Sequence, residues 1–166
     1  MVRASEKPPI ERRFTLKTDT DPALTAGVLW WGPGDPQMQL GPHGLVRAMR
    51  LASGPATLEV AWQGKPLVAR AWGEGASEAL SLAPGLLGDL DDASPLVAHH
   101  QVLGELARRQ PGLRLTRGAP VIEMLVNAII GQKVTGLEAR RSQRLLFTRL
   151  GEPAPGPHTP AATAAA

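Results

Sequence analysis

The chain has 166 residues, of which 43% are hydrophobic and 20% charged, and its formal net charge is +3. These values indicate a globular chain with room for one domain, or for a small domain and part of another, and they exclude a wholly disordered protein. Because the chain contains no cysteine, disulfides, thiolate catalysis and a cysteine-ligated zinc site are also excluded.

The beginning of the chain predicts a loose segment, a strand and a short helix. Residues 1–9 are polar and contain two prolines, which favours a flexible arm. Polar and apolar residues alternate over Arg13–Lys17, and this alternation predicts a first strand. Asp21 can cap a helix that has proline at its first position, so a helix is predicted over Pro22–Leu29.

Alternating apolar residues predict a group of strands between residues 37 and 72. In the clearest of them, every second residue from Ala56 to Trp62 is apolar. The turn-forming residues 63–65 join this strand to a returning one. The full set of predicted strands is Gln37–Leu40, Leu45–Leu51, Ala56–Trp62 and Leu67–Trp72. A period of two over successive segments predicts an antiparallel sheet with one covered face.

A helix over Ala76–Ala83, ended by Pro84, is a natural cover for that face. Residues 10–94 are therefore predicted to form an N-terminal α+β domain, with an antiparallel sheet and covering helices. Near Asp91 the apolar pattern changes from a period of two to one of 3.6. We take this change as the boundary with a second, helical part of the chain.

Residues 95–151 are predicted to be helical. Ser94 can cap a first helix that begins at Pro95 and ends near Arg109. A second helix, Ala119–Gly131, carries a wide apolar stripe of the kind that packs inside a helical domain.

A third helix is predicted to begin after Thr135. Glu138 stands three residues further on, which is the spacing of a capping box. After this helix the composition changes, because residues 152–166 are rich in proline and alanine. We predict a disordered tail there.

Positive charge is concentrated in the helical part. Nine arginine or lysine residues lie between positions 108 and 149, against Glu123 and Glu138. Such an excess favours phosphate binding, because each neutralised phosphate releases counterions. A solvated helix face is the alternative interpretation. The adjacent His99 and His100 make a poor metal clamp, because neighbouring side chains on a helix diverge. Asp89, Asp91 and Asp92 could bind a cation, but we favour an acidic interdomain loop, so no metal or cofactor is predicted.

Two segments of the helical part carry a family resemblance. Pro111-Gly112-Leu113-Arg114-Leu115 is followed by Val121-Ile122-Glu123-Met124-Leu125-Val126-Asn127-Ala128-Ile129-Ile130-Gly131-Gln132-Lys133-Val134-Thr135. In order and spacing these segments resemble the opening of the helical domain in the DNA-3-methyladenine glycosylase II family, which belongs to the helix-hairpin-helix superfamily of base-excision repair enzymes. The similarity covers about residues 95–152, and over residues 10–94 it rests on the order of elements alone.

The resemblance implies a fold and a set of DNA-binding residues. The N-terminal domain would resemble half of a TATA-binding protein, and residues 95–151 would be the first helices of an incomplete all-α glycosylase domain. Gln132 takes the family's glutamine position at the helix end, and Lys133 stands where the family usually has an apolar wedge that fills the gap left by a flipped base. The residues expected to bind DNA are Gln132, Lys133, Thr135, Arg140, Arg141 and Arg144.

The same resemblance leaves the activity of this chain open. The family's glycine-rich hairpin and catalytic aspartate have no counterpart after Thr135, and no residue is assigned as catalytic. By family the protein would be a DNA glycosylase that removes alkylated purines, yet we expect this chain alone to be inactive, with weak, non-specific binding to double-stranded DNA. The alternatives are a non-enzymatic DNA-binding module and an unrelated α+β interaction protein. A cytoplasmic bacterial location, with no membrane partner, is the simplest expectation.

Overall fold

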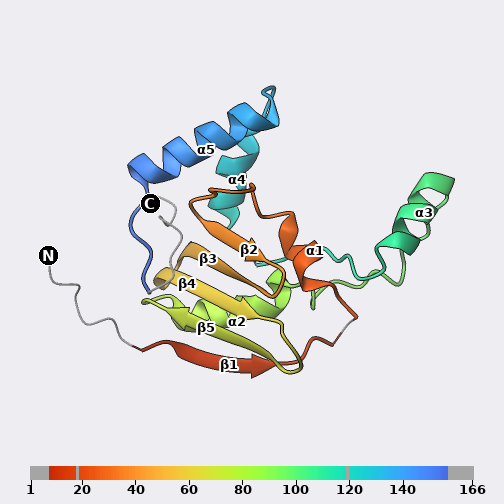
Figure 1. Ribbon diagram of the computed structural model, residues 1–166, viewed down its shortest axis with the longest axis horizontal. Helices are drawn as coiled ribbons and strands as arrows, with labels where there is room; N and C mark the ends of the chain where they lie inside the picture. Colours follow the sequence, from red (N-terminus) through yellow and green to blue (C-terminus); the bar gives the residue numbers. More distant parts are fainter. Residues whose placement is uncertain (1–7, 18, 119, 157–166) are drawn as a thin grey trace, which may run out of the picture.

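The computed structural model of the chain describes residues 8–17, 19–118 and 120–156. Its elements are β1 (Ile10–Phe14), α1 (Pro22–Gly27), β2 (Met38–Gly41), β3 (Gly44–Leu51), β4 (Gly54–Ala61), β5 (Leu67–Trp72), α2 (Ala76–Leu86), α3 (Gln101–Arg109), α4 (Val121–Ile130) and α5 (Gly136–Leu150). The fold is α+β, as predicted, with the strands of the described residues in the first half of the chain and α3 to α5 in the second (Figure 1). Within those residues, no helix is both long enough and apolar enough to cross a membrane.

The strands form one antiparallel sheet in the order β1-β5-β4-β3-β2. Its longest pairing joins β3 to β4, with Leu45 opposite Val60 and Met49 opposite Ala56. The predicted alternation in β4 is confirmed, because Ala56, Leu58 and Val60 are all buried on the core face. β1 pairs only with β5, so the first strand in the sequence lies at one edge and β2 lies at the other.

Helix α2 covers the core face of the sheet (Figure 1). Alanines dominate the contact: Ala56, Ala69 and Ala71 on the strands, and Ala76, Ala79 and Ala83 on the helix. Because alanine adds little bulk, the helix lies close to the strands, and the larger Leu80 and Leu86 fill the space at the sides. The core of the first half is therefore narrow and well filled.

Several predicted boundaries were wrong. Helix α1 ends at Gly27 rather than at Leu29. The first strand is Ile10–Phe14 rather than Arg13–Lys17, because pairing with β5 ends where Phe14 stands opposite Leu67. Helix α2 continues to Leu86 with Pro84 inside it. A proline in the last turn removes a single backbone hydrogen bond, and burial of Leu86 offsets that loss.

The start of α3 was also misplaced. Ser94 does not cap a helix; its backbone N–H donates to the Asp92 carboxylate at 2.9 Å and closes a turn. The helix begins at Gln101, where the Nδ1 of His100 accepts from the N–H of Val102 at 3.2 Å. The sequence did not predict a histidine cap, because serine before proline is the commoner signal for the start of a helix.

The segment after α5 returns to the sheet. Glu152 accepts from the Arg50 guanidinium at 2.8 Å, Ala154 is buried, and Gly156 lies against the Trp72 ring. Residues 152–156, the beginning of the predicted disordered tail, are thus packed against β3 and β5. Residues 1–7 of the predicted arm and 157–166 of the predicted tail lie outside the described residues.

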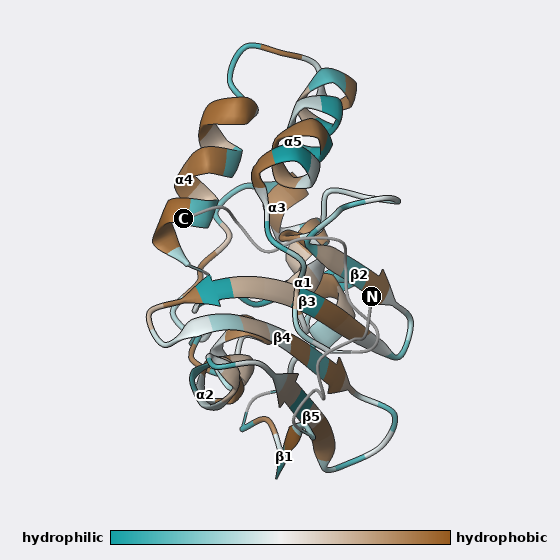
Figure 2. Ribbon diagram, turned by 90° about the vertical axis from the view of Figure 1, so that its left-hand side faces the viewer, coloured by the Kyte–Doolittle hydropathy of each residue, from teal (hydrophilic) through white to brown (hydrophobic). Residues whose placement is uncertain are grey.

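The later helices extend away from this core. α4 and α5 lie side by side beyond the β2–β3 side of the sheet, while α3 stands apart from them (Figure 1). None of the residues of α3 is buried. In α4 the predicted apolar stripe faces outward, with Val121 79%, Leu125 53% and Ile129 57% exposed, and Figure 2 shows this helix as largely hydrophobic.

Candidate nucleic-acid interface

The corner between α4 and α5, residues Gly131–Val134, is exposed to solvent. The chain leaves α4 through a tight turn, in which Gly131 N–H donates to the Asn127 carbonyl and Gln132 N–H to the Ile129 carbonyl, both at 3.1 Å. Lys133 has a φ of 55°, in the left-handed region that glycine adopts more readily. The backbone therefore presents the side chains of Gln132 and Lys133 at the tip of the hairpin.

Thr135 and Glu138 form the predicted capping box at the start of α5. The Glu138 N–H donates to the Thr135 hydroxyl at 3.3 Å, and the hydroxyl and the backbone N–H of Thr135 donate to the Glu138 carboxylate at 2.7 and 2.9 Å. These hydrogen bonds lower the pKa of Glu138, and the one from the Thr135 hydroxyl has the largest effect. Both residues thus cap the start of α5, and the Thr135 hydroxyl already takes part in two hydrogen bonds.

Three of the four arginines of α5 were predicted to bind DNA, and they have different surroundings. Arg140 and Arg141 are exposed in the first turns, and the Arg140 Nε donates to the Gly136 carbonyl at 3.2 Å. Arg144 donates to the carbonyls of Gly34 at 3.1 Å and of Pro33 at 3.0 Å. Gly34 has a φ of 80°, which favours glycine, and a Cβ there would displace the Arg144 guanidinium. Arg144 holds α5 against the loop before β2.

The acidic residues near the corner all have partners. Among residues 120–156 they are Glu123, Glu138 and Glu152. Glu138 is in the capping box, Glu152 pairs with Arg50, and Glu123 is buried in an ion pair with Arg47. Burial raises the pKa of the Glu123 carboxyl, and the neighbouring Arg47 opposes that shift only in part. None of the three carboxylates is placed to face a nucleotide at the corner.

The first segment of the motif, Pro111–Leu115, packs beside α1. Gly112 accepts from the Asp21 N–H at 2.8 Å, and a Cβ at position 112 would stand 2.7 Å from that nitrogen. The Arg114 N–H donates to the Thr25 hydroxyl at 3.3 Å, and its guanidinium donates to the Asp19 carbonyl at 3.0 Å. This part of the motif therefore joins the two halves of the chain.

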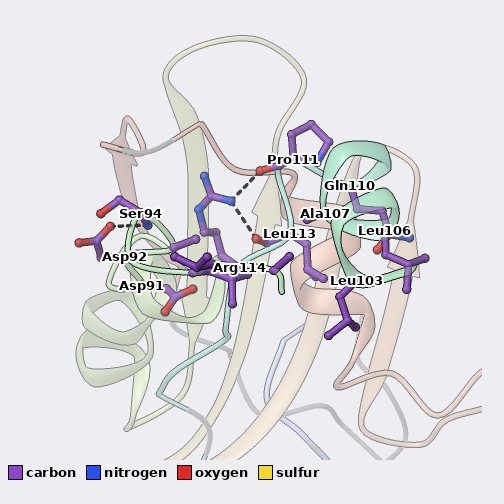
Figure 3. A pocket seen from close by; sticks show the side chains of 14 residues that line it. Asp91, Asp92, Ser94, Leu103, Leu106, Ala107, Gln110, Pro111, Leu113 and Arg114 are labelled. Atoms are coloured by element: carbon purple, nitrogen blue, oxygen red, sulfur yellow. Dashed lines mark hydrogen bonds between the residues drawn. The ribbon is translucent and has the colours of Figure 1, made fainter. Parts of the chain in front are cut away.

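A hollow of about 700 Å³ lies between α3 and the segments on either side of it (Figure 3). Its apolar lining includes Leu96, Val97, Leu103, Leu106 and Leu113. The Arg114 guanidinium turns to the carbonyls of Pro111 and Leu113 at 2.7 and 2.8 Å, and Asp91 accepts from the Leu115 N–H at 2.9 Å. The charged groups of the hollow are thus bound to backbone, which makes it a surface for apolar contact rather than for acid–base chemistry.

No group of three histidine, aspartate or glutamate side chains that could hold a metal ion occurs in residues 8–17, 19–118 and 120–156. The acidic residues Asp89, Asp91 and Asp92 accept hydrogen bonds from backbone N–H groups instead. Asp89 accepts from the Lys17 N–H, Asp91 from Leu115 and Asp92 from Ser94. Asp91 therefore joins the end of the first half to the second, while Asp89 and Asp92 fasten their loops within the first half and at the boundary.

No family model matches the sequence, and no curated protein matches it. Among solved structures, the chain is similar to the 3-methyladenine DNA-glycosylase from Archaeoglobus fulgidus, with a TM-score of 0.67 and 17% sequence identity. The similarity covers 85% of this chain and 51% of that one, so this chain spans about half the length of its structural neighbour. At this identity the similarity shows a shared fold.

A polar contact between the sheet and the hairpin was missed from the sequence. Arg47, Glu123 and Gln143 are buried where α4 and α5 meet the sheet. Two signals were present: Arg47 occupies a core-face position of β3, and Glu123 interrupts the apolar run of α4. Each alone suggests a solvated charge, and only the tertiary structure brings the two together.

Proposed function

We propose that this chain is the DNA-binding front of a base-excision repair protein related to the DNA-3-methyladenine glycosylases, and that it binds double-stranded DNA through the corner Gly131–Val134 and the first turns of α5. One observation carries the proposal: a basic, exposed corner on a fold shared with a 3-methyladenine DNA-glycosylase. This chain spans about half of that protein. A relation to glycosylase activity is therefore part of the proposal and not an observation.

The backbone of Lys133 supports a role in binding. A non-glycine residue in the left-handed region costs roughly 1–2 kcal/mol, and Lys133 is exposed, so packing does not demand a lysine there. Backbone strain that packing of the core does not require suggests a functional role for the strained residue. The charge and long stem of lysine fit a phosphate or a base edge at the tip of the hairpin.

The remaining predicted site residues divide into two groups. Gln132, Arg140 and Arg141 are exposed beside Lys133 and supply the polar and cationic surface that the proposal requires. Thr135 and Arg144 serve the hairpin itself, one as the cap of α5 and the other as its link to Pro33 and Gly34. We therefore assign direct phosphate contacts to Lys133, Arg140 and Arg141, with Arg144 adding long-range charge.

The salt dependence of DNA binding tests this assignment. With three or four phosphate contacts, log K for a duplex should fall with log salt at a slope of roughly −3. The double variant Lys133→Ala, Arg140→Ala should flatten that slope by about two. Alanine at position 133 meets the same left-handed strain as lysine, so the change removes charge without relieving the backbone.

A charge-matched control is available on α3. Arg108→Ala with Arg109→Ala removes two positive charges from a helix that stands apart from the hairpin (Figure 1). This control should leave the slope nearly unchanged. An equal effect of the two double variants would mean that only net charge matters. A slope that neither pair alters would contradict the proposed interface and favour the alternative of a solvated basic face.

We also expect no base excision by the 166-residue chain alone. A cationic sugar needs a fixed negative charge beside it, and loss of one such group costs about 10²–10³ in rate. Gln132 is neutral and Glu138 is held in the capping box. The measurement is release of 3-methyladenine from methylated duplex DNA. Release that Glu138→Gln abolishes would overturn this expectation and make Glu138 the catalytic carboxylate.

A second candidate function, that of an interaction protein, is favoured by the apolar surface of α3, of the segment before it and of α4. Leu96, Val97, Leu103 and Val121 are all more than half exposed. Exposed apolar patches of this kind mark contact sites. Duplex binding with a steep salt dependence separates this candidate from the proposed function, because an apolar contact surface releases no counterions.

A further inference from the structure

A buried ion pair joins the sheet to the α4–α5 hairpin. Arg47 lies on β3, opposite Met38 on β2 and Leu58 on β4, and so projects from the core face of the sheet. Its guanidinium contacts the Glu123 carboxylate of α4, and the two side chains are 2% and 1% exposed. A second guanidinium nitrogen lies 3.6 Å from the Met38 sulfur. The positive charge of Arg47 thus lies among apolar side chains, and the carboxylate that neutralises it comes from a different element, α4.

The hairpin is joined to the first half of the chain by polar side chains as well as by the apolar Met124, which packs against the core. In α4 the buried residues are Glu123 and Asn127, four positions apart on one face, whereas the apolar stripe points away. In α5 the buried Gln143 donates to the Asp35 carboxylate at 3.3 Å, and Arg144 donates to the neighbouring loop carbonyls. Apolar contacts tolerate sliding, but a charge-assisted hydrogen bond has a narrow range of geometry. These directional contacts therefore set the orientation of the hairpin.

Stability alone does not account for the pair. Within the described part of the chain, the Arg47 Nε and the Asn127 Oδ1 have no hydrogen-bond partner although both are buried. Incompletely satisfied buried polar groups are less stabilising than an apolar contact of the same volume. Such groups are best attested where they select one arrangement among several.

We infer that Arg47 and Glu123 are positioning residues, which fix the hairpin and hence the corner Gly131–Val134 relative to the sheet. Arg47 touches neither the corner nor a ligand; it acts through Glu123 and α4. The effect of this ion pair on DNA binding rests on the proposed function. Its effect on the position of the hairpin does not. The pair thus links the core of the first domain to the placement of Lys133.

A distance measurement without DNA tests whether the ion pair fixes the position of the hairpin. The chain contains no cysteine, so Arg12→Cys on the exposed edge strand and Gln132→Cys at the corner provide two unique sites for spin labels. The labelled protein should give a narrow distance distribution. Glu123→Gln leaves a buried, uncompensated Arg47 and should broaden or shift that distribution. Glu105→Gln on α3, which removes a carboxylate from the surface pairs with Arg108 and Arg109, is the matched control and should change nothing.

A double variant separates positioning from stability. Arg47→Met with Glu123→Leu replaces both charges by apolar groups of similar size, so the fold should be kept even if the single variant fails to fold. We expect hydrogen-exchange protection of α4 and α5 to remain, while the label distance stays shifted or broad. A distance distribution equal to that of the parent protein would overturn the inference.

The DNA measurement then tests the consequence. In the unlabelled chain, both variants should bind duplex DNA about tenfold more weakly, the effect of losing one or two phosphate contacts. Equal affinity despite a displaced corner would overturn the link between the pair and DNA binding. If the parent chain binds no DNA, the proposed function fails, and the label distances still decide whether the pair fixes the hairpin.

Discussion

At the scale of single residues, two glutamates of the helical half have opposite electrostatic environments. Glu123 is buried beside Arg47, and burial raises its pKa. Glu138 is exposed, and its hydrogen bonds with Thr135 lower its pKa. A group with a raised folded-state pKa favours folding when it is protonated, and a group with a lowered one favours folding when it is ionised. The two residues should therefore contribute to stability at opposite ends of the acid range.

Urea unfolding of Glu123→Gln and Glu138→Gln across the acid range tests this prediction. The stability of the parent protein relative to Glu123→Gln should be greatest at acid pH, and should fall as pH rises above the ordinary glutamate value through the raised pKa. The stability of the parent protein relative to Glu138→Gln should be greatest at neutral pH, and should fall as the pH drops through the lowered pKa of Glu138. The same trend for both variants would contradict the assigned environments.

At the scale of elements, α5 depends on its first residues. The helix has 15 residues and few buried ones, namely Ala139, Gln143 and Phe147. With so little of its surface in a core, the capping box is a large part of what starts the helix. The sequence spacing of Thr135 and Glu138 was sufficient to predict this element.

Thr135→Ala should lower the free energy of unfolding by about 1 kcal/mol, because the Glu138 N–H loses its acceptor. Thr135→Ser keeps the hydroxyl and should cost less than half as much. Chemical denaturation measures both, and hydrogen exchange should place the loss in the first turn of α5. Equal losses for serine and alanine would show that the methyl group, rather than the cap, matters.

At the scale of the whole molecule, apolar surface is distributed unevenly. The first half buries its apolar residues between the sheet and α2, whereas α3 and α4 expose theirs. Monomeric proteins rarely expose contiguous apolar patches larger than a few hundred Å². We therefore expect the chain by itself to self-associate through its second half.

We predict concentration-dependent association in sedimentation experiments, together with binding of a hydrophobic dye. Leu125→Gln with Ile129→Gln should reduce both, since these side chains are 53% and 57% exposed. The free energy of unfolding should change by less than about 0.5 kcal/mol per site, as for other surface substitutions. A parent protein that stays monomeric at high concentration and binds no dye would contradict this prediction.

The sequence by itself determined those features that depend on neighbours along the chain. The alternation in β4, the return strand Leu67–Trp72 and the capping box of α5 all follow from local spacing, and the structure has each of them. Only the tertiary structure decided how α4 is oriented. Its apolar stripe is of the kind that packs inside a helical domain, yet in this chain Glu123 and Asn127 face the sheet. The physical reason is that Arg47 occupies a core position of β3 and requires a buried carboxylate, and no pattern within α4 reveals a partner 76 residues away.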